Sequence, residues 1–139
     1  MCPRDTVTGM RLAMHRLPVP QYRAELVILY GTTSAMASVV ADHRVPTEAF
    51  RDFVAADDEV LYGSTSNVCG GTGEVRRSIY VFIDSSQSAE EKLGTIVHEC
   101  FHAVVRLMHD IGQKIRPNTD EPAAYLLEWA VKETRRVCR

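Results

Sequence analysis

The chain has 139 residues, enough for one domain with a hydrophobic core and too short for two, so we expect residues 1–139 to form a single domain. A composition of 45% hydrophobic and 24% charged residues is typical of a globular protein and excludes a chain that is disordered throughout. The net charge of −2 and the pI of about 6.2 leave no large basic surface, which argues against a nucleic-acid partner.

The apolar segments predict a cytoplasmic protein without a membrane partner. Residues 1–5 lead into no apolar signal segment, and the longest strongly apolar run, residues 26–30, is far shorter than a membrane span. The cysteines form no Cys-x-x-Cys pair, so we expect reduced thiols rather than a disulfide framework or a thiolate zinc site. They are Cys2, Cys69, Cys100 and Cys138.

Two strands and a helix are predicted in the first half of the chain. Residues 24–30 (AELVILY) form an aliphatic and aromatic run that is followed by the turn formers of residues 31–34, which predicts a buried strand. Residues 45–54 have apolar side chains at helical spacing after Thr47, a suitable N-cap, and predict a short amphipathic helix. Residues 60–62 predict a short strand.

A glycine-rich segment precedes the clearest strand of the chain. Residues 63–73 (GSTSNVCGGTG) are rich in turn formers and predict a flexible turn. They lack the Gly-Lys-Ser/Thr ending that would contact a nucleotide's phosphates and magnesium, so a phosphate loop is not expected. Residues 77–84 (RSIYVFID) alternate aliphatic and aromatic side chains and predict a strand.

Two helices are predicted in the last third of the chain. Ser88 and Glu91 form a capping box, which starts a long helix that should end near Asp110 with Gly112 as its stop signal. A second helix should begin near residues 119–122, where a proline is tolerated in the first turn, and continue close to the C-terminus. The expected fold class is α+β, with a few-stranded sheet packed on the long helix and the C-terminal helix after it.

The long helix contains the sequence HECFH, residues 98–102, which matches the HExxH pattern. Residues four apart lie on nearly the same side of a helix, so His98 and His102 can bind one ion while Glu99 is offset toward a metal-bound water. Zinc with three protein ligands keeps an open position, lowers the pKa of its water and polarises a carbonyl. The pattern therefore predicts Zn²⁺ as cofactor and Glu99 as general base.

The position of the two histidines on the helix favours metal binding over core packing. Taken at about 100° per residue, they lie nearly opposite the apolar side chains of the same helix. His109 points to the same side but lies roughly 10 Å farther along, too far to share the ion, and is expected either to be exposed to solvent or to act as a positive charge at the helix C-terminus. The apolar sector is expected to contain Leu93, Ile96, Val97, Cys100, Val104, Leu107, Met108 and Ile111.

A catalytic zinc needs a third protein ligand, and the second helix offers candidates on the face opposite its apolar side chains. The connection of about ten residues is long enough to return the start of that helix to a position beside His102. We favour Glu121, because it shares a face with the small Ala124. Asp120 and Glu128 are the alternatives, and a carboxylate in a first helical turn is favoured by the helix dipole even without a metal.

The segment 80–129 resembles the small gluzincin-like zinc metallopeptidases, including short proteins found in phages and prophages. The resemblance is carried by YVFID, TIVHECFHAV and DEPAAYLLEW and covers about a third of the chain. It implies a small zincin-like domain with His98, His102 and Glu121 as zinc ligands. It also implies a sheet whose edge strand pairs with an extended substrate beside the site, for which residues 77–84 are the natural candidate.

The leading functional hypothesis is a hydrolase that cleaves a peptide bond in a protein or peptide substrate, with Glu99 deprotonating the water. Tyr125, one turn after Glu121, either directs its hydroxyl toward an oxyanion or is an ordinary packing aromatic. A second hypothesis is a non-catalytic, zinc-containing binding protein on the same scaffold that engages a protein partner. A third is a helix-rich interaction domain that binds no metal. Zinc content and Glu99→Gln separate the three hypotheses.

Overall fold

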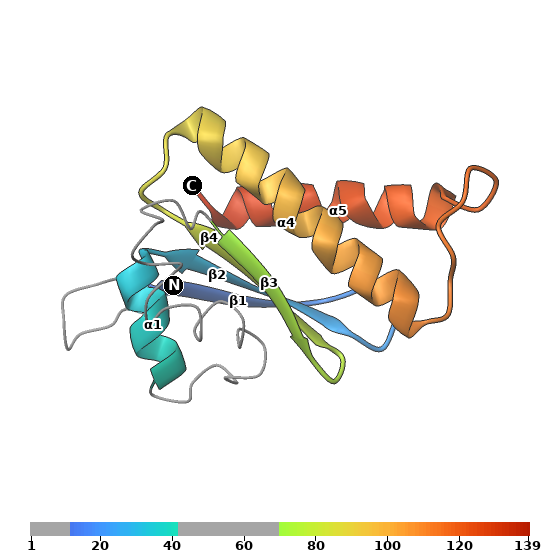
Figure 1. The fold of residues 1–139 in the computed structure, drawn as a ribbon, viewed down its shortest axis with the longest axis horizontal. Coiled ribbons are helices and arrows are strands. Elements are labelled where there is room, and N and C mark those ends of the chain that lie inside the picture. The colour runs from blue at the N-terminus through green and yellow to red at the C-terminus, as the bar shows by residue number, and fades with distance from the viewer. Residues whose placement is uncertain (1–11, 42–69) are drawn as a thin grey trace, which may run out of the picture.

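A computed structural model of the protein describes residues 12–41 and 70–139. Four strands and three helices make up these residues, and they are built around one sheet (Figure 1). In chain order the elements are β1 (Leu12–Pro18), β2 (Glu25–Gly31), α1 (Thr33–Ala41), β3 (Gly70–Val75), β4 (Ser78–Asp84), α4 (Ala89–Asp110) and α5 (Glu121–Val137).

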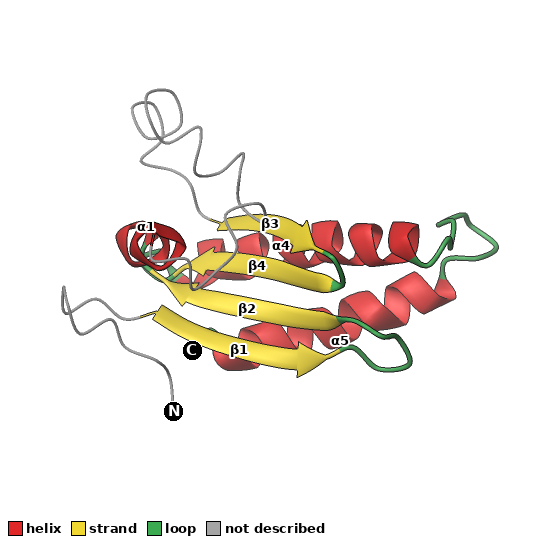
Figure 2. Ribbon diagram, turned by 90° about the horizontal axis from the view of Figure 1, so that it is seen from below, coloured by secondary structure: helices red, strands yellow, loops and turns green. Residues whose placement is uncertain are grey.

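The four strands form a mixed sheet in the order β1-β2-β4-β3. The central pair, β2 and β4, is parallel, and the two outer strands pair antiparallel with them. Helices α4 and α5 lie on one face of the sheet and α1 lies on the other (Figures 1 and 2). The fold is therefore α+β, as the sequence predicts.

Alternating side chains of the central strands give the sheet an apolar core on each face. Ile28 of β2 and Val81 of β4 belong to the core beneath α4 and α5. Leu29 and Phe82, the next residues along the same strands, belong to the core on the face of α1. Burial on both faces explains why these strands read as continuous apolar runs.

The predicted strands 24–30 and 77–84 and both predicted helices are confirmed to within two residues. The Ser88 hydroxyl accepts a hydrogen bond from the Glu91 amide at 3.2 Å, as the capping box requires. Gly112 follows α4 with a φ of 72°, a conformation that glycine adopts without steric cost. The predicted helix 45–54, the predicted strand 60–62 and residues 63–69 of the predicted turn lie outside the described residues.

Three features of the sheet differ from the predictions. The glycines of residues 70–73 form the first part of β3 rather than a turn. Residues 78–84 form an internal strand, β4, so the outer strand beside α4 is β3 and not the segment named above as the edge. Neither β1 nor α1 is predicted from the sequence. The Thr32 hydroxyl accepts a hydrogen bond from the Ala35 amide at 3.1 Å, so part of the expected turn starts a helix.

The apolar sector predicted for α4 is correct on one side only. Leu93 and Val97 are each 43% exposed, whereas Ala103 and the charged Glu99 are buried. Strand β3 covers the flank of the helix that carries Glu99, as the hydrogen bonds between these two elements show. The sequence periodicity therefore identifies the buried face of α4 approximately. The buried face that the structure shows is centred closer to β3 than the predicted one.

The structure also bears on the predictions for the cysteines and for His109. Cys100 and Cys138 are free and buried, and burial raises the pKa of the Cys100 thiol to about 11; Cys2 and Cys69 lie outside the described residues. His109 is exposed. Of the helices in the described ranges, none is long and apolar enough to cross a membrane.

Candidate metal centre

His98 and His102, the histidine pair, lie side by side on the exposed surface of α4. Their Nε2 atoms are 3.1 Å apart, and the two rings meet edge to face at 78°. Two imidazoles bound to one tetrahedral zinc at about 2.05 Å would have their nitrogens about 3.3 Å apart. The histidine pair therefore has the spacing that two ligands of a common ion need.

Glu99 projects from the same helix turn toward the sheet and is only 6% exposed. The Thr72 hydroxyl of β3 lies 2.7 Å from Glu99 Oε1 and 3.2 Å from the Glu99 carbonyl oxygen, and it donates to them. The other carboxylate oxygen, Oε2, is 3.9 Å from His98 Nε2. The carboxylate thus has one oxygen hydrogen-bonded to the strand and the other turned toward the histidine pair.

Gly70 allows β3 to approach α4 closely enough for this contact. A Cβ atom at this position would lie 2.6 Å from the Phe82 carbonyl oxygen, 2.9 Å from Thr95 Cγ2 and 3.1 Å from Glu99 Cγ. The first two distances are shorter than real Cβ contacts, and the nearest atom belongs to the backbone. A residue larger than glycine would therefore force β3 away from both β4 and α4.

The carboxylates of α5 do not join the histidine pair. Cys100 Sγ lies 3.4 Å from Thr134 Oγ1, which marks where α4 and α5 meet beside the pair. Glu121 is thirteen positions before Thr134, roughly 20 Å along the axis of α5 at 1.5 Å per residue, and Glu128 is roughly 9 Å along it. Within residues 12–41 and 70–139, no three His, Cys, Asp or Glu side chains are grouped so that they could hold one metal ion.

The other predicted residues of α5 lie on its exposed side. Tyr125 is 68% exposed, and Asp120 and Glu121 are exposed at the start of the helix. The Glu128 carboxylate forms an ion pair with Lys132 at 2.8 Å, which lowers the pKa of Glu128. The assignment of a third ligand and the catalytic assignment of Tyr125 remain predictions.

A second group of charged side chains lies at the far end of the β3–α4 contact. The pKa of Glu74 is raised to about 7, first by burial and then by the hydrogen bond and the negative charge of Asp110. The positive charges of Arg106 and Arg77 oppose this rise. The side-chain hydrogen bond between Glu74 and Asp110 therefore links strand and helix here through a carboxyl pair.

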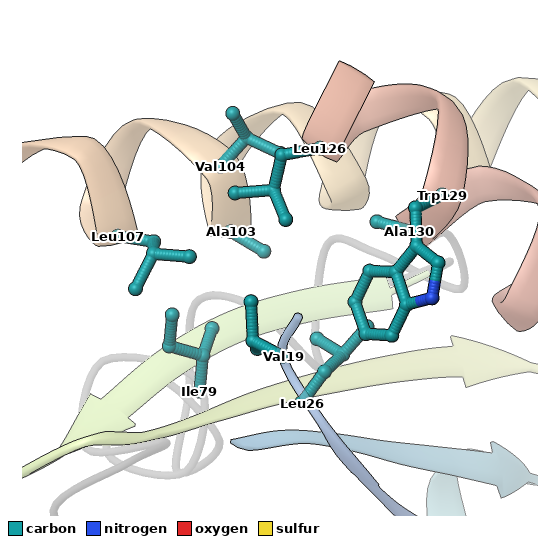
Figure 3. Close-up of a pocket in the computed structure, with 9 residues that line it drawn as sticks. All are labelled: Val19, Leu26, Ile79, Ala103, Val104, Leu107, Leu126, Trp129 and Ala130. Carbon is teal, nitrogen blue, oxygen red and sulfur yellow. The ribbon is translucent and has the colours of Figure 1, made fainter. Parts of the chain in front are cut away.

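A small apolar pocket lies on the opposite side of α4 from the histidine pair, between the helices and the sheet (Figure 3). Leu26 and Ile79 line it from the strands, Val104 from α4, and Leu126 and Trp129 from α5. Because these residues belong to or pack against the core beneath the helices, the pocket is a packing gap rather than part of the candidate centre.

Thr72 and Gly70 are the site residues that the sequence does not reveal. Both fall in the segment that predicts a turn, and their relation to Glu99, almost thirty residues away, arises only when β3 packs against α4. Alternation of glycine with Thr72 and Glu74 along residues 70–75 is the one local sign of a strand. Comparisons with known protein families, with curated proteins and with solved structures found no match to this chain.

Proposed function

We propose that the protein is a zinc-dependent peptidase that cleaves a peptide bond in a protein or peptide substrate. The observation that carries the proposal is the arrangement on α4: two imidazole nitrogens 3.1 Å apart on the exposed surface, with a buried carboxylate 3.9 Å from one of them. Core histidines of ordinary packing would be buried among side chains of the sheet or of α5. Here the pair faces solvent, where a substrate can reach it.

His98 and His102 would hold the zinc ion through Nε2, and Glu99 would accept the proton of the attacking water. A zinc ion in this position supplies a Lewis acid that activates water near neutral pH and polarises the scissile carbonyl. The base is already fixed before the substrate arrives, because its Oε1 accepts the Thr72 hydroxyl hydrogen bond. Such a prearranged proton acceptor contributes about 10²- to 10⁴-fold to the rate.

Strand β3 is the natural place for the substrate backbone. It is an outer strand of the described sheet and runs along the flank of α4 that carries Glu99. An extended peptide that adds to an outer strand gains backbone hydrogen bonds, and its carbonyl groups would then pass in front of the histidine pair. This replaces residues 78–84 by residues 70–75 as the substrate-binding strand of the proposal.

The third ligand would come from α5. The sequence favours Glu121 as this ligand, whereas the packing of α5 against α4 favours Glu128. Glu121 is the ligand that the resemblance to gluzincin-like peptidases implies, and its use would require α5 to move along α4 when the metal binds. Glu128 is nearer to the histidine pair and is held only by an exposed ion pair, which constrains its side chain weakly. Zinc affinities of Glu121→Gln and Glu128→Gln identify the ligand, because only its loss weakens zinc binding.

The test measures zinc and cleavage together on protein purified without a metal-affinity tag. We expect one zinc per chain after supplementation, loss of zinc in His98→Ala and His102→Ala, and cleavage of a mixed peptide library by the wild type. Glu99→Gln should retain zinc and lose at least about 10²-fold in kcat. His109→Ala, a change of another histidine on the same helix, is the matched control and should retain both properties.

Each possible result leads to one conclusion. Less than a tenth of a zinc per chain overturns the proposal and leaves an interaction domain without metal. Full zinc occupancy with no cleavage by the wild type of any library peptide or denatured protein leaves a zinc-containing binding protein on the same scaffold. Because a catalytic zinc needs three protein ligands and a structural zinc four, the absence of a third ligand beside the histidine pair, within the described residues, favours the interaction domain without metal as the second candidate.

A further inference from the structure

Glu99 is the one charged residue that is buried in the described part of the chain. A buried carboxylate without hydrogen bonds is costly, because it loses its water shell and gains nothing in return. The Thr72 hydroxyl is the side chain that meets this need, at 2.7 Å from Oε1. The same hydroxyl reaches the Glu99 carbonyl oxygen at 3.2 Å, so it binds both the side chain and the backbone of this residue.

We propose that Thr72 of the outer strand is a positioning residue for Glu99, an inference that rests on the proposed peptidase function. Its hydroxyl holds Oε1 and so directs Oε2, the oxygen 3.9 Å from His98 Nε2, toward the reacting water. A free glutamate side chain loses rotamer freedom when it is fixed in one position. Because Thr72 fixes the Glu99 side chain in the folded protein, the loss of rotamer entropy occurs on folding and does not add to the barrier of the reaction.

The strand that bears Thr72 is the one that would bind the substrate, which makes the placement of the base depend on β3. Side chains alternate along β3, so Gly70, Thr72 and Glu74 face α4 while the residues between them face the opposite side of the sheet. Gly70 permits the close approach, Thr72 makes the hydrogen bond, and Glu74 meets Asp110 farther along. Thr72 is therefore the member of this row that acts on the candidate centre.

A purely structural role for Thr72 predicts different behaviour. If the hydroxyl only joined β3 to α4, its loss would lower stability and disturb the substrate-binding strand, which raises KM. If it positions Glu99, its loss lowers kcat while KM and zinc content stay as in the wild type. The two roles are therefore separated by which kinetic constant changes.

The experiment compares Thr72→Val, which keeps the shape and loses the hydroxyl, with Thr72→Ser, which keeps the hydroxyl. We expect Thr72→Val to lose about 10- to 100-fold in kcat, with KM within about twofold and zinc content unchanged, and Thr72→Ser to recover kcat to within about threefold. Thr95→Val is the matched control, since Thr95 also faces β3 but its hydroxyl donates to Gln87 and to the Glu91 carbonyl group. It should keep the wild-type kcat.

A second measurement does not depend on activity. In crystal structures of the zinc-free proteins, the Glu99 carboxylate should keep one conformation in the wild type and in Thr72→Ser and leave the strand in Thr72→Val. If Thr72→Val does not fold, Thr72→Cys replaces it, because a thiol is a weaker donor of similar size, and we expect a smaller loss in kcat of the same kind.

The outcomes separate this inference from the proposed function. An active wild type whose Thr72→Val variant retains kcat, or shows a raised KM instead, overturns the role of Thr72 and leaves the peptidase assignment standing. An unmoved Glu99 carboxylate in the Thr72→Val structure also overturns it. A wild type without zinc and without cleavage overturns the proposed function and the inference with it.

Discussion

The two outer strands of the sheet, β1 and β3, are fixed to the molecule in different ways. Strand β1 pairs with β2, and its Arg16 side chain reaches the Glu25 carboxylate of that strand at 2.7 Å. Glu25 also accepts a hydrogen bond from the Ser78 hydroxyl at 2.6 Å. Strand β1 is therefore held by side-chain contacts between neighbouring strands, and the charged groups of its ion pair remain partly exposed to solvent.

Strand β3 is instead fixed by contact with a helix. Three of its first four residues are glycine, so its backbone can lie directly against β4 and α4. Its two polar side chains on this face, Thr72 and Glu74, reach Glu99 and Asp110 of the helix. The outer strand with the fewest side chains is thus the one that shapes the candidate centre, because small residues permit the close approach that a buried hydrogen bond needs.

The largest effect is expected from Gly70→Ala. The added methyl group would meet the Phe82 carbonyl oxygen at 2.6 Å, and backbone cannot move aside as a side chain can. We expect the free energy of unfolding to fall by about 2 to 3 kcal/mol, as for an overpacked core, with zinc binding retained. Urea denaturation measures this change.

Gly94→Ala is the matched control for Gly70→Ala. Gly94 lies in α4, and a Cβ atom there would have nothing within 4 Å. Alanine should therefore stabilise the helix by about 0.5 to 1 kcal/mol. Equal effects of the two substitutions would show that β3 is not packed tightly against β4 and α4 at Gly70.

The carboxyl pair at the other end of β3 predicts a smaller effect that depends on pH. Because the pKa of Glu74 is raised from 4.5 to about 7, its contribution to stability is full below about pH 4.5 and is lost as the pH rises through about 7. Glu74→Gln should match the wild type near pH 5 and be more stable at about pH 8, by about 1 kcal/mol once solvent screening is allowed for. Urea denaturation at several pH values measures the difference.

Asp110→Asn tests the cause of this pH dependence. Asp110 raises the pKa of Glu74 through a hydrogen bond and its charge, so Glu74→Gln should change stability less at high pH when Asp110→Asn is also present. Arg106 and Arg77 face the same group and act in the opposite direction. A stability difference between Glu74→Gln and the wild type that does not vary with pH would contradict the carboxyl pair.

The smallest effect is expected at β1. Arg16→Gln removes an ion pair whose side chains are 48% and 31% exposed, so the loss should not exceed about 0.5 kcal/mol. It should also shrink further in about 1 M salt, which screens exposed charges. A loss above about 1.5 kcal/mol would mean that the two outer strands are not as different as their contacts indicate.

Local patterns account for the parts of the structure that the sequence predicts. The capping box at Ser88, the stop at Gly112 and the apolar period of α5 each depend on neighbours within a few residues. The exposed positions of His98 and His102 follow from the same periodicity. These features were predictable because helix geometry alone relates residues three and four apart.

The strand order and the surroundings of Glu99 depend instead on residues that are far apart in the sequence. Residues 70–73 have weak strand preference, and they form β3 because β4 supplies hydrogen bonds and α4 covers them. For the same reason the sequence does not show that β4 is an internal strand, because nothing in its own apolar run indicates that β3 pairs beyond it. Tertiary packing also decides how α5 lies along α4, and this placement determines which carboxylate could be a third metal ligand.

The sequence by itself determined the two long helices, the central strands and the pairing of His98 with His102 on one helix turn. Only the tertiary structure decided that a glycine-rich strand lies beside that turn, that Glu99 is buried against it and that Thr72 binds the carboxylate. The physical reason is the range of the interactions. Helix periodicity acts over a few residues, whereas burial and hydrogen bonding of Glu99 depend on a strand almost thirty residues away that is recognised only once it packs.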